Sequence, residues 1–276
     1  MGRIEGAIEK AILWQDFYGY PIWIFIVIVL LLMVLIVLIF LLRKPRIKID
    51  IGNAQFLGVA QVQNDYFASW ENENGIFAIV SDGIGMNRYG RDCAEIVVKT
   101  YMEAFKEAKP IIDVPLFLKR LVRLANQRIT KYVPGIDCGA TLAAVLIQGD
   151  ELHWISVGNS AIMIAGKEEI VRLNETYTEL YFNEAAYKRK PLAYFDKYIG
   201  LEDDLKAQSG KLSLKKGQHV LLCTDGVYLQ MSEQDMLKIL KKERSAFERA
   251  QEILLKIENK QRTDQDNASL IVMDII

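Results

Sequence analysis

Short apolar runs alternate with longer helical patterns along most of the chain. Runs of about four to eight apolar, often β-branched residues indicate strands, and apolar residues that recur every three or four positions indicate helices. The predicted strands are residues 56–62, 66–70, 77–81, 141–147, 151–156, 161–165, 218–224 and 268–275. The predicted helices are residues 91–108, 115–132, 232–241 and 246–260, whereas residues 174–210 give no clear pattern. Strands grouped as hairpins and interrupted by paired helices indicate an α+β fold, with antiparallel sheets covered by helices.

A different pattern precedes this region, because the chain from Ile22 to Leu42 is an unbroken apolar run. As a helix it would span about 32 Å, which is enough to cross a hydrocarbon core. A cleaved signal peptide does not fit, since the run is too long and no small-residue cleavage site follows it. A buried core helix would carry polar residues somewhere in such a run. We therefore expect one transmembrane helix at residues 21–42.

The charges beside this run predict its orientation. Four basic residues follow it between positions 43 and 48, whereas Arg3 and Lys10 precede it. The positive-inside rule then places the C-terminal part in the cytoplasm and the N-terminus outside a single-pass cell-membrane protein. The apolar stripe at residues 4–13 either lies along the outer leaflet or forms a short lead-in helix. The expected organisation is an extracytoplasmic amphipathic tail (1–20), the transmembrane helix (21–42), a basic juxtamembrane linker (43–54) and one domain (55–276).

Composition limits the classes of function. The net charge of −1 argues against a general nucleic-acid-binding protein, because the chain has no basic surplus to neutralise phosphates. The three cysteines, Cys93, Cys138 and Cys223, lack paired spacing and are expected to be buried thiols rather than disulfides or zinc ligands. The two histidines, His153 and His219, each lie near the start of a predicted strand, so a histidine metal cluster or a Ser-His-Asp triad is poorly supported.

Three aspartates lie where predicted strands begin or end. Asp82 follows the strand at 77–81 and is itself followed by Gly83, Asp225 follows another apolar run, and Asp266 precedes the last one. Taken alone, an Asp-Gly pair is also a common turn. Carboxylates at strand ends that are far apart in sequence can nevertheless converge on a hard divalent cation. Magnesium and manganese both prefer such oxygen ligands.

The order of the motifs around these aspartates is more specific than any one of them. The chain carries Asp-Gly-x-Gly at 82–85, Gly-Ala-Thr-Leu at 139–142, Trp-Ile-Ser-Val-Gly-Asn-Ser at 154–160, Leu-Cys-Thr-Asp-Gly at 222–226 and Asp-Asn-Ala-Ser-Leu-Ile-Val at 266–272. From about residue 51 to the end, this series resembles the metal-dependent protein phosphatases, the PPM or type 2C serine/threonine phosphatases. The resemblance implies a four-layer α-β-β-α sandwich of two antiparallel sheets flanked by helices.

The resemblance also implies a site for two divalent cations, Mn²⁺ or Mg²⁺. The implied metal ligands are Asp65, Asp82, Gly83 through its carbonyl, Asp225 and Asp266. Three of these aspartates, Asp82, Asp225 and Asp266, are also the implied catalytic residues. Two such cations acidify a bridging water and neutralise phosphoryl oxygens, so no protein nucleophile is needed. The implied partners are a phosphorylated protein substrate and a cognate serine/threonine kinase.

Three positions depart from the family pattern. Ala60 stands where the family has a phosphate-binding arginine, Asn64 where glutamate is usual, and Asn159 where an aspartate is usual. Alanine cannot replace a bidentate arginine contact to phosphate, although Arg88 or Arg91 is a candidate substitute. Three interpretations therefore stay open: an active membrane-anchored phosphatase, a pseudophosphatase that binds phosphoproteins with little turnover, and a membrane scaffold.

Overall fold

The computed structural model describes residues 22–42, 47–85, 88–134, 136–175, 198–200, 205 and 207–276. The chain divides after Pro45 into two compact units. In the first unit, α2 (Ile22–Leu42) is a continuous helix, and its described side chains are mostly exposed. Among the described residues, no helix meets the length and apolar character needed to cross a membrane. The predicted transmembrane helix is thus not confirmed, and the tail at 1–20 lies outside the described residues.

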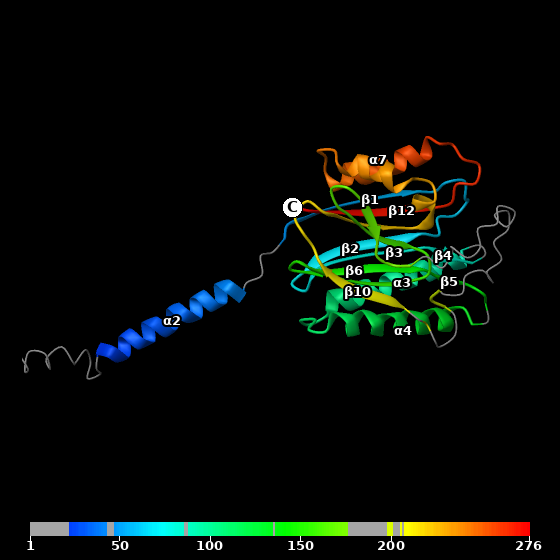
Figure 1. Ribbon diagram of the computed structural model, residues 1–276. Helices are drawn as coiled ribbons and strands as arrows, with labels where there is room; N and C mark the ends of the chain where they lie inside the picture. Colours follow the sequence, from blue (N-terminus) through cyan, green and yellow to red (C-terminus); the bar gives the residue numbers. More distant parts are fainter. Residues whose placement is uncertain are drawn as a thin grey trace, which may run out of the picture. The chain divides into compact units, whose positions relative to one another are not determined.

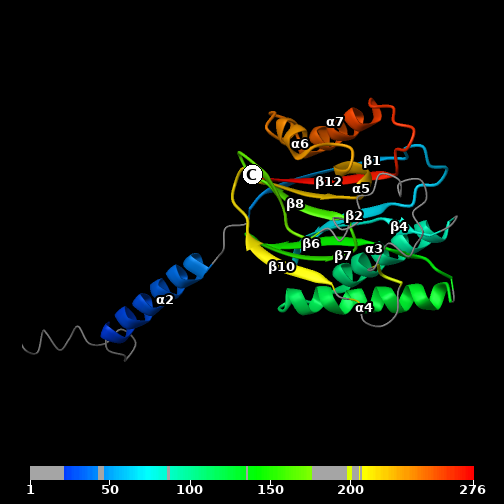
Figure 2. The same cartoon turned by 45° about the vertical axis from the view of Figure 1, so that its right-hand side comes forward.

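Two antiparallel five-stranded sheets form the second unit (Figures 1 and 2). The first sheet has the order β1 (Ile49–Phe56), β12 (Ala268–Ile275), β11 (His219–Cys223), β8 (Ala161–Ala165) and β9 (Ile170–Arg172). The second has the order β10 (Gln208–Ser213), β7 (Glu151–Val157), β6 (Leu142–Gln148), β3 (Gly75–Ser81) and β2 (Tyr66–Asn72). A short pair, β4 (Gly83–Ile84) with β5 (Gly139–Ala140), extends beyond β3.

Helices cover the outer face of each sheet (Figure 2). α3 (Tyr89–Glu107) and α4 (Val114–Tyr132) pack on the second sheet, whereas α6 (Glu233–Leu240) and α7 (Ala246–Glu258) pack on the first. A third apolar cluster, which includes Val80, Val145, Leu222 and Ile271, fills the space between the two sheets. The predicted α+β fold with two antiparallel sheets flanked by helices is therefore confirmed.

Local sequence explains where these helices begin. The carboxylate of Asp113 accepts a hydrogen bond from the Leu116 amide at 2.9 Å, and Pro115 occupies the first turn of α4. α7 begins with a capping box in which Ser245 and Glu248 satisfy each other's backbone amides. Such caps bind amide groups that have no partner inside the helix.

One predicted strand is wrong. Residues 57–65 form a loop instead of the strand expected at 56–62, and Leu57 and Val59 are 43% and 61% exposed. Gly58 has a φ of +67°, which interrupts an extended run, so the apolar pattern at 56–62 did not reflect a buried strand.

The first strand lies earlier, at residues 49–56, so residues 49–54 of the expected linker belong to the domain. Gly52 and Asn53 are weak strand formers, and they obscure the pattern of β1. Gly52 is required by close packing, because a Cβ atom there would lie 2.1 Å from the backbone nitrogen of Phe247 in α7. The short elements β9, β10 and α5 (Asp225–Tyr228) were also missed.

Candidate functional site

The sequence-predicted site residues lie on loops that hydrogen bonds join to one another. Asp65 closes the loop after β1, Asp82 follows β3, Asp225 opens α5 after β11, and Asp266 precedes β12. The loop at 57–65 is bound to the loop before β12, because the Val59 amide donates to the Gln265 carbonyl at 3.0 Å. The strand order of the two sheets therefore brings together segments that are up to about two hundred residues apart in sequence.

Asp65 is the most informative of these residues, because its carboxylate is buried at 2% exposure. Its Oδ2 accepts a hydrogen bond from the Thr224 hydroxyl at 2.8 Å, whereas its Oδ1 is buried with no hydrogen-bond partner among the described residues. Burial, with a smaller contribution from the carboxylates of Asp225 and Asp266, raises the pKa of Asp65 to about 7, although the hydroxyls of Thr224 and Ser269 oppose the shift. Several negative charges thus act on one buried group.

Asp225 is also buried and is oriented by Asn159. The Asn159 side-chain amide donates to Oδ2 of Asp225 at 3.1 Å. The backbone carbonyl of Asn159 in turn accepts hydrogen bonds from the Arg172 guanidinium at 2.7 Å and from the Tyr228 hydroxyl at 3.0 Å. The guanidinium also lies over the Tyr228 ring, 4.5 Å from its centroid. Burial, with Asp225 adding to it, raises the pKa of Tyr228 well above its ordinary value, so its hydroxyl keeps its proton.

The backbone of Asp82 is fixed by one threonine. The Asp82 amide donates to the Thr141 hydroxyl at 2.9 Å, and the Thr141 amide donates to the Asp82 carbonyl at 2.8 Å. The Thr141 hydroxyl lies 2.6 Å from the Ser160 hydroxyl, and Gly83 pairs with Ala140 in the short ladder next to it. The motifs at 139–142 and 158–160 therefore position Asp82, a role that their sequence alone did not reveal.

Gly83 lies where three segments meet. A Cβ atom at Gly83 would be 2.1 Å from the Gly90 carbonyl oxygen and 2.8 Å from that of Asn64, so no other residue fits without a shift of the backbone. The Asn64 amide donates to Oδ1 of Asn267 at 2.7 Å. Oδ1 of Asp266, whose side chain is exposed, accepts a hydrogen bond from the Asn267 amide at 2.8 Å. Asn267 thus joins the Asp266 loop to the loop that carries Asn64.

The donor chemistry of this region fits divalent cations. Besides Oδ1 of Asp65, the buried Oδ1 atoms of Asn64 and Asn159 lack partners within the described parts of the chain. Carboxylate and amide oxygens are ligands of magnesium and manganese, which also accept backbone carbonyls and water. In the described ranges, no three His, Cys, Asp or Glu side chains form a group that holds a metal by themselves. The roles of Asp65, Asp82, Gly83, Asp225 and Asp266 as ligands stay a prediction.

Neither expected substitute for the absent arginine is buried among the acids, and their role in phosphate binding stays a prediction. Ala60 is half-buried in the loop that leads to Asp65. Arg88 is 77% exposed and lies 3.7 Å from the Asp92 carboxylate, and Arg91 is exposed. Among the described residues, Arg172 is a cation next to Asp225, because it binds the carbonyl of Asn159, whose amide binds that acid. Sequence reasoning missed Arg172 because its strand is only three residues long.

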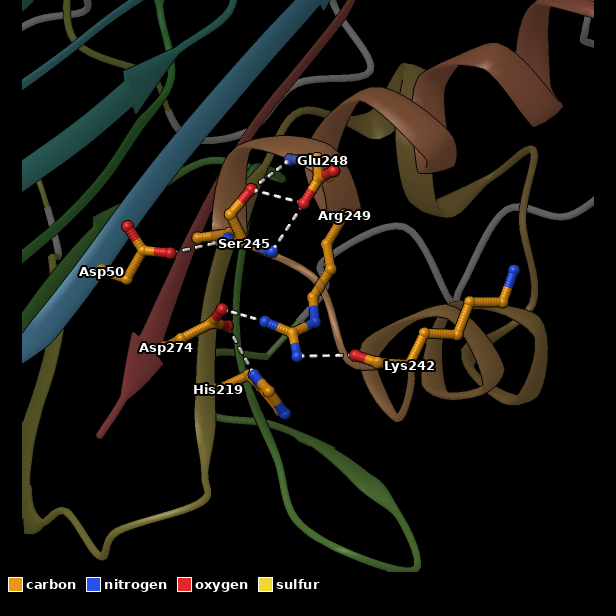
Figure 3. Close-up of polar contacts among 8 residues, drawn as sticks. Asp50, His219, Lys242, Ser245, Glu248, Arg249 and Asp274 are labelled. Carbon is orange, nitrogen blue, oxygen red and sulfur yellow. Dashed lines mark hydrogen bonds and ion pairs between the residues drawn. The ribbon is translucent and has the colours of Figure 1, made fainter.

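The cysteines and histidines take no part in this arrangement. All three cysteines are free and buried, which confirms their prediction as buried thiols. His153 lies 2.8 Å from Glu151 on β7. His219 lies at the start of β11, at the far end of that strand from Asp225, and is bound to Asp274, which also binds Arg249 (Figure 3).

Comparison with known proteins identifies the family. The protein phosphatase 2C family model matches residues 57–266. The serine/threonine phosphatase stp of Listeria monocytogenes serovar 1/2a is 23% identical over 218 residues, which cover 74% of this chain and 86% of the relative. Among solved structures, the S. agalactiae serine/threonine phosphatase has a TM-score of 0.74 at 20% identity and covers 83% of this chain and 100% of its own. The catalytic domain of PstP in complex with two manganese ions has a TM-score of 0.70 at 19% identity. The match covers 83% of this chain and 99% of the PstP chain. This chain belongs to the protein phosphatase 2C family of serine/threonine phosphatases.

Proposed function

We propose that the chain is a membrane-anchored, metal-dependent phosphatase that removes phosphate from phosphoserine and phosphothreonine in proteins. The observation that carries the proposal is the buried Asp65 carboxylate, which has an unpartnered oxygen and lies within the field of Asp225 and Asp266. A buried charge that lacks a counter-charge is costly. A divalent cation would remove that cost, and one relative was solved with two manganese ions.

Asp65, Asp82, Asp225, Asp266 and the Gly83 carbonyl would hold two cations, Mn²⁺ or Mg²⁺. When bound, such ions supply a hydroxide from water near neutral pH and neutralise charge on the phosphoryl oxygens. Both metals take this ligand set, so the residues themselves do not select between them.

The surrounding residues of this chain fix the acids in place. Thr224 orients the buried Asp65 side chain through its hydroxyl. Thr141 fixes the backbone that carries Asp82, and the Asn159 amide orients Asp225. Because these hydrogen bonds are present before any substrate binds, the acids need little rearrangement during the reaction, and preorganised groups are the more effective catalysts.

A pseudophosphatase is the second candidate, and a specific observation supports it. Ala60 and Asn64 lie in the loop that carries Asp65, and both replace the charged residues usual in the family. Arg172 donates from Nε to the Asn174 carbonyl and from Nη2 to the Asn159 carbonyl, so part of its guanidinium is already used. Phosphate recognition by a free arginine is therefore weakened. No observation supports a pure scaffold.

The release of phosphate from a phosphothreonine peptide tests the two candidates. The full-length chain in detergent should release phosphate with Mn²⁺ and stop when EDTA is added. Asp82→Asn and Asp225→Asn should each lower kcat by at least a hundredfold. Asp264→Asn is the matched control, because Asp264 is exposed near Asp266 and binds Arg262. Full activity of Asp82→Asn would overturn the metal-dependent mechanism, and binding without turnover by the wild type would favour the pseudophosphatase.

The proposal of a membrane anchor rests on the sequence alone, on the apolar run at 22–42 and the basic residues that follow it. The phosphatase domain would then lie in the cytoplasm, where a cognate serine/threonine kinase would supply its substrate. The protein should remain in the membrane fraction after a carbonate wash, and protease added to intact cells should leave the domain uncut. Recovery in the soluble fraction would refute the anchor, and digestion from outside would refute the orientation.

A further inference from the structure

A groove runs between β1 and α7 on the outer side of the first sheet. The groove is open to solvent and has a volume of about 380 Å³. Its lining includes Gln55, Phe56, Phe247, Gln251, Leu255 and Glu258. Phe247 and Leu255 are 55% and 54% exposed, and both line the groove. An exposed apolar patch of this kind is typical of a binding surface.

The groove is joined directly to the candidate metal site. The side-chain amide of Gln55 donates to the backbone carbonyl of Asp65 at 3.1 Å and to the Ser269 hydroxyl at 3.0 Å. Leu57 follows Phe56 of the groove lining and is 43% exposed, and its carbonyl accepts a hydrogen bond from the Asn267 side-chain amide at 2.8 Å. A peptide that occupies the groove would therefore extend to the acids of the site.

The charge of the groove indicates which peptide it favours. Glu248, Glu252 and Glu258 line it, against a single lining cation, Arg244. Glu252 is paired with Arg244 at 2.9 Å and also with Lys242, so it adds no free negative charge. Glu248 caps α7, and Glu258 forms no ion pair with a described residue. These two acidic side chains beside the apolar centre are complementary to a segment that carries both apolar and basic residues.

We propose that this groove binds the part of the phosphoprotein substrate that flanks the phosphorylated residue. An apolar side chain of the substrate lies between Phe247 and Leu255, and a basic side chain lies against the glutamates. The inference rests on the proposed function and deepens it, because it names a substrate class. It also accounts for Ala60: where no arginine holds the phosphate, remote contacts supply the binding energy.

Two phosphothreonine peptides and one small substrate test the proposal on the full-length chain in detergent with Mn²⁺. The first peptide carries leucines and lysines on both sides of the phosphothreonine, and the second carries serines there. p-Nitrophenyl phosphate is too small to reach the groove. Leu255→Gln is the main variant, and Leu124→Gln on α4 is its control, because Leu124 is also exposed but lies on the other sheet's helix layer.

Leu255→Gln should raise KM for the leucine-lysine peptide about tenfold, which corresponds to about 1.4 kcal/mol, and leave kcat unchanged. The kinetics with p-nitrophenyl phosphate and with the serine peptide should not change, and Leu124→Gln should behave as the wild type does. Glu258→Lys should likewise raise KM for the peptide that carries lysines. A thermal melt shows whether each variant is folded.

An equal effect of Leu255→Gln on p-nitrophenyl phosphate, or no effect on either substrate, would overturn the proposal. The proposal would also be wrong if Leu255→Gln converted a dimer to a monomer, or abolished binding to anionic vesicles, while KM for the peptide stayed unchanged. If the wild type hydrolyses nothing, the proposed function fails. Binding of the fluorescently labelled leucine-lysine peptide then tests the groove separately: weaker binding to Leu255→Gln supports it, and equal binding refutes it.

Discussion

Replacement of Asn159 by aspartate probes the electrostatics of the site most sharply. Asn159 and Asp225 are both buried, and the amide nitrogen of one lies 3.1 Å from Oδ2 of the other. Asn159→Asp replaces this donor by a second carboxylate oxygen at nearly the same distance. At an effective dielectric of about 20, two unit charges this close repel by about 5 kcal/mol. The charge-assisted hydrogen bond, worth about 1.5–3 kcal/mol, is lost as well.

Protonation limits the repulsion, because two close carboxylates share one proton when no cation is present. In EDTA at pH 8 we therefore expect the variant to lose several kcal/mol of unfolding free energy, and to lose less at pH 5. Mn²⁺ should restore more stability to Asn159→Asp than it adds to the wild type, because the cation neutralises the pair.

Urea unfolding of the full-length chain in detergent, followed by tryptophan fluorescence, measures these differences. Asn159→Ala is the matched control, since it removes the hydrogen bond but adds no charge, and it should respond to Mn²⁺ as the wild type does. The backbone carbonyl of residue 159, which binds Arg172 and Tyr228, is retained in both variants. Equal stability of Asn159→Asp and the wild type in EDTA at pH 8 would refute the reasoning.

Three further predictions concern the fold, the buried acid and phosphate recognition. Gly52→Ala should lower the free energy of unfolding by about 1–3 kcal/mol or more, because the new Cβ atom would meet the backbone of α7. Gly166→Ala is the control in the same urea titration, because a Cβ atom there would have its nearest neighbour 3.8 Å away. The pKa of Asp65 is raised from 3.8 to about 7 in the folded state, so its contribution to stability in EDTA is fully present below about pH 4 and is lost as the pH rises through 7. Asp65→Asn should remove this dependence, and an unchanged pH profile would contradict the assignment. Ala60→Arg with Asn64→Glu should raise kcat/KM for p-nitrophenyl phosphate about ten- to a hundredfold, by restoring a charge-assisted contact and a metal ligand; an unchanged value would show that another cation already holds the phosphate.

Much of the fold could be predicted from the sequence because the central strands are strongly apolar. The strands predicted at 161–165 and 268–275 match β8 and β12 in full, and α3 and α4 begin within two residues of their predicted starts. β1 was missed because its identity depends on a tertiary contact: Gly52 disrupts the apolar pattern but is needed beneath α7. Local propensity carries no information about such a close approach.

The candidate aspartates could be selected from the sequence, but the hydrogen-bond network around them could not. Asp82 and Asp225 stand out because glycine follows each of them after an apolar run. Thr141, Thr224 and Arg172 act through hydrogen bonds between segments that are distant in sequence, and their residue types occur in many other contexts. Only the pairing of the strands in the folded protein shows which of these residues contact the aspartates and their loops.

The measurement that tests the central claim most directly is the rate of phosphate release from a phosphothreonine peptide by the wild-type chain as Mn²⁺ is titrated. We predict no release in EDTA and a rate that rises with Mn²⁺ until the ion sites are filled. Asn64 stands in place of an acidic ligand, so this rise should require a high Mn²⁺ concentration. A folded protein that releases no phosphate at any Mn²⁺ concentration, or one that releases it equally well in EDTA, would contradict the account.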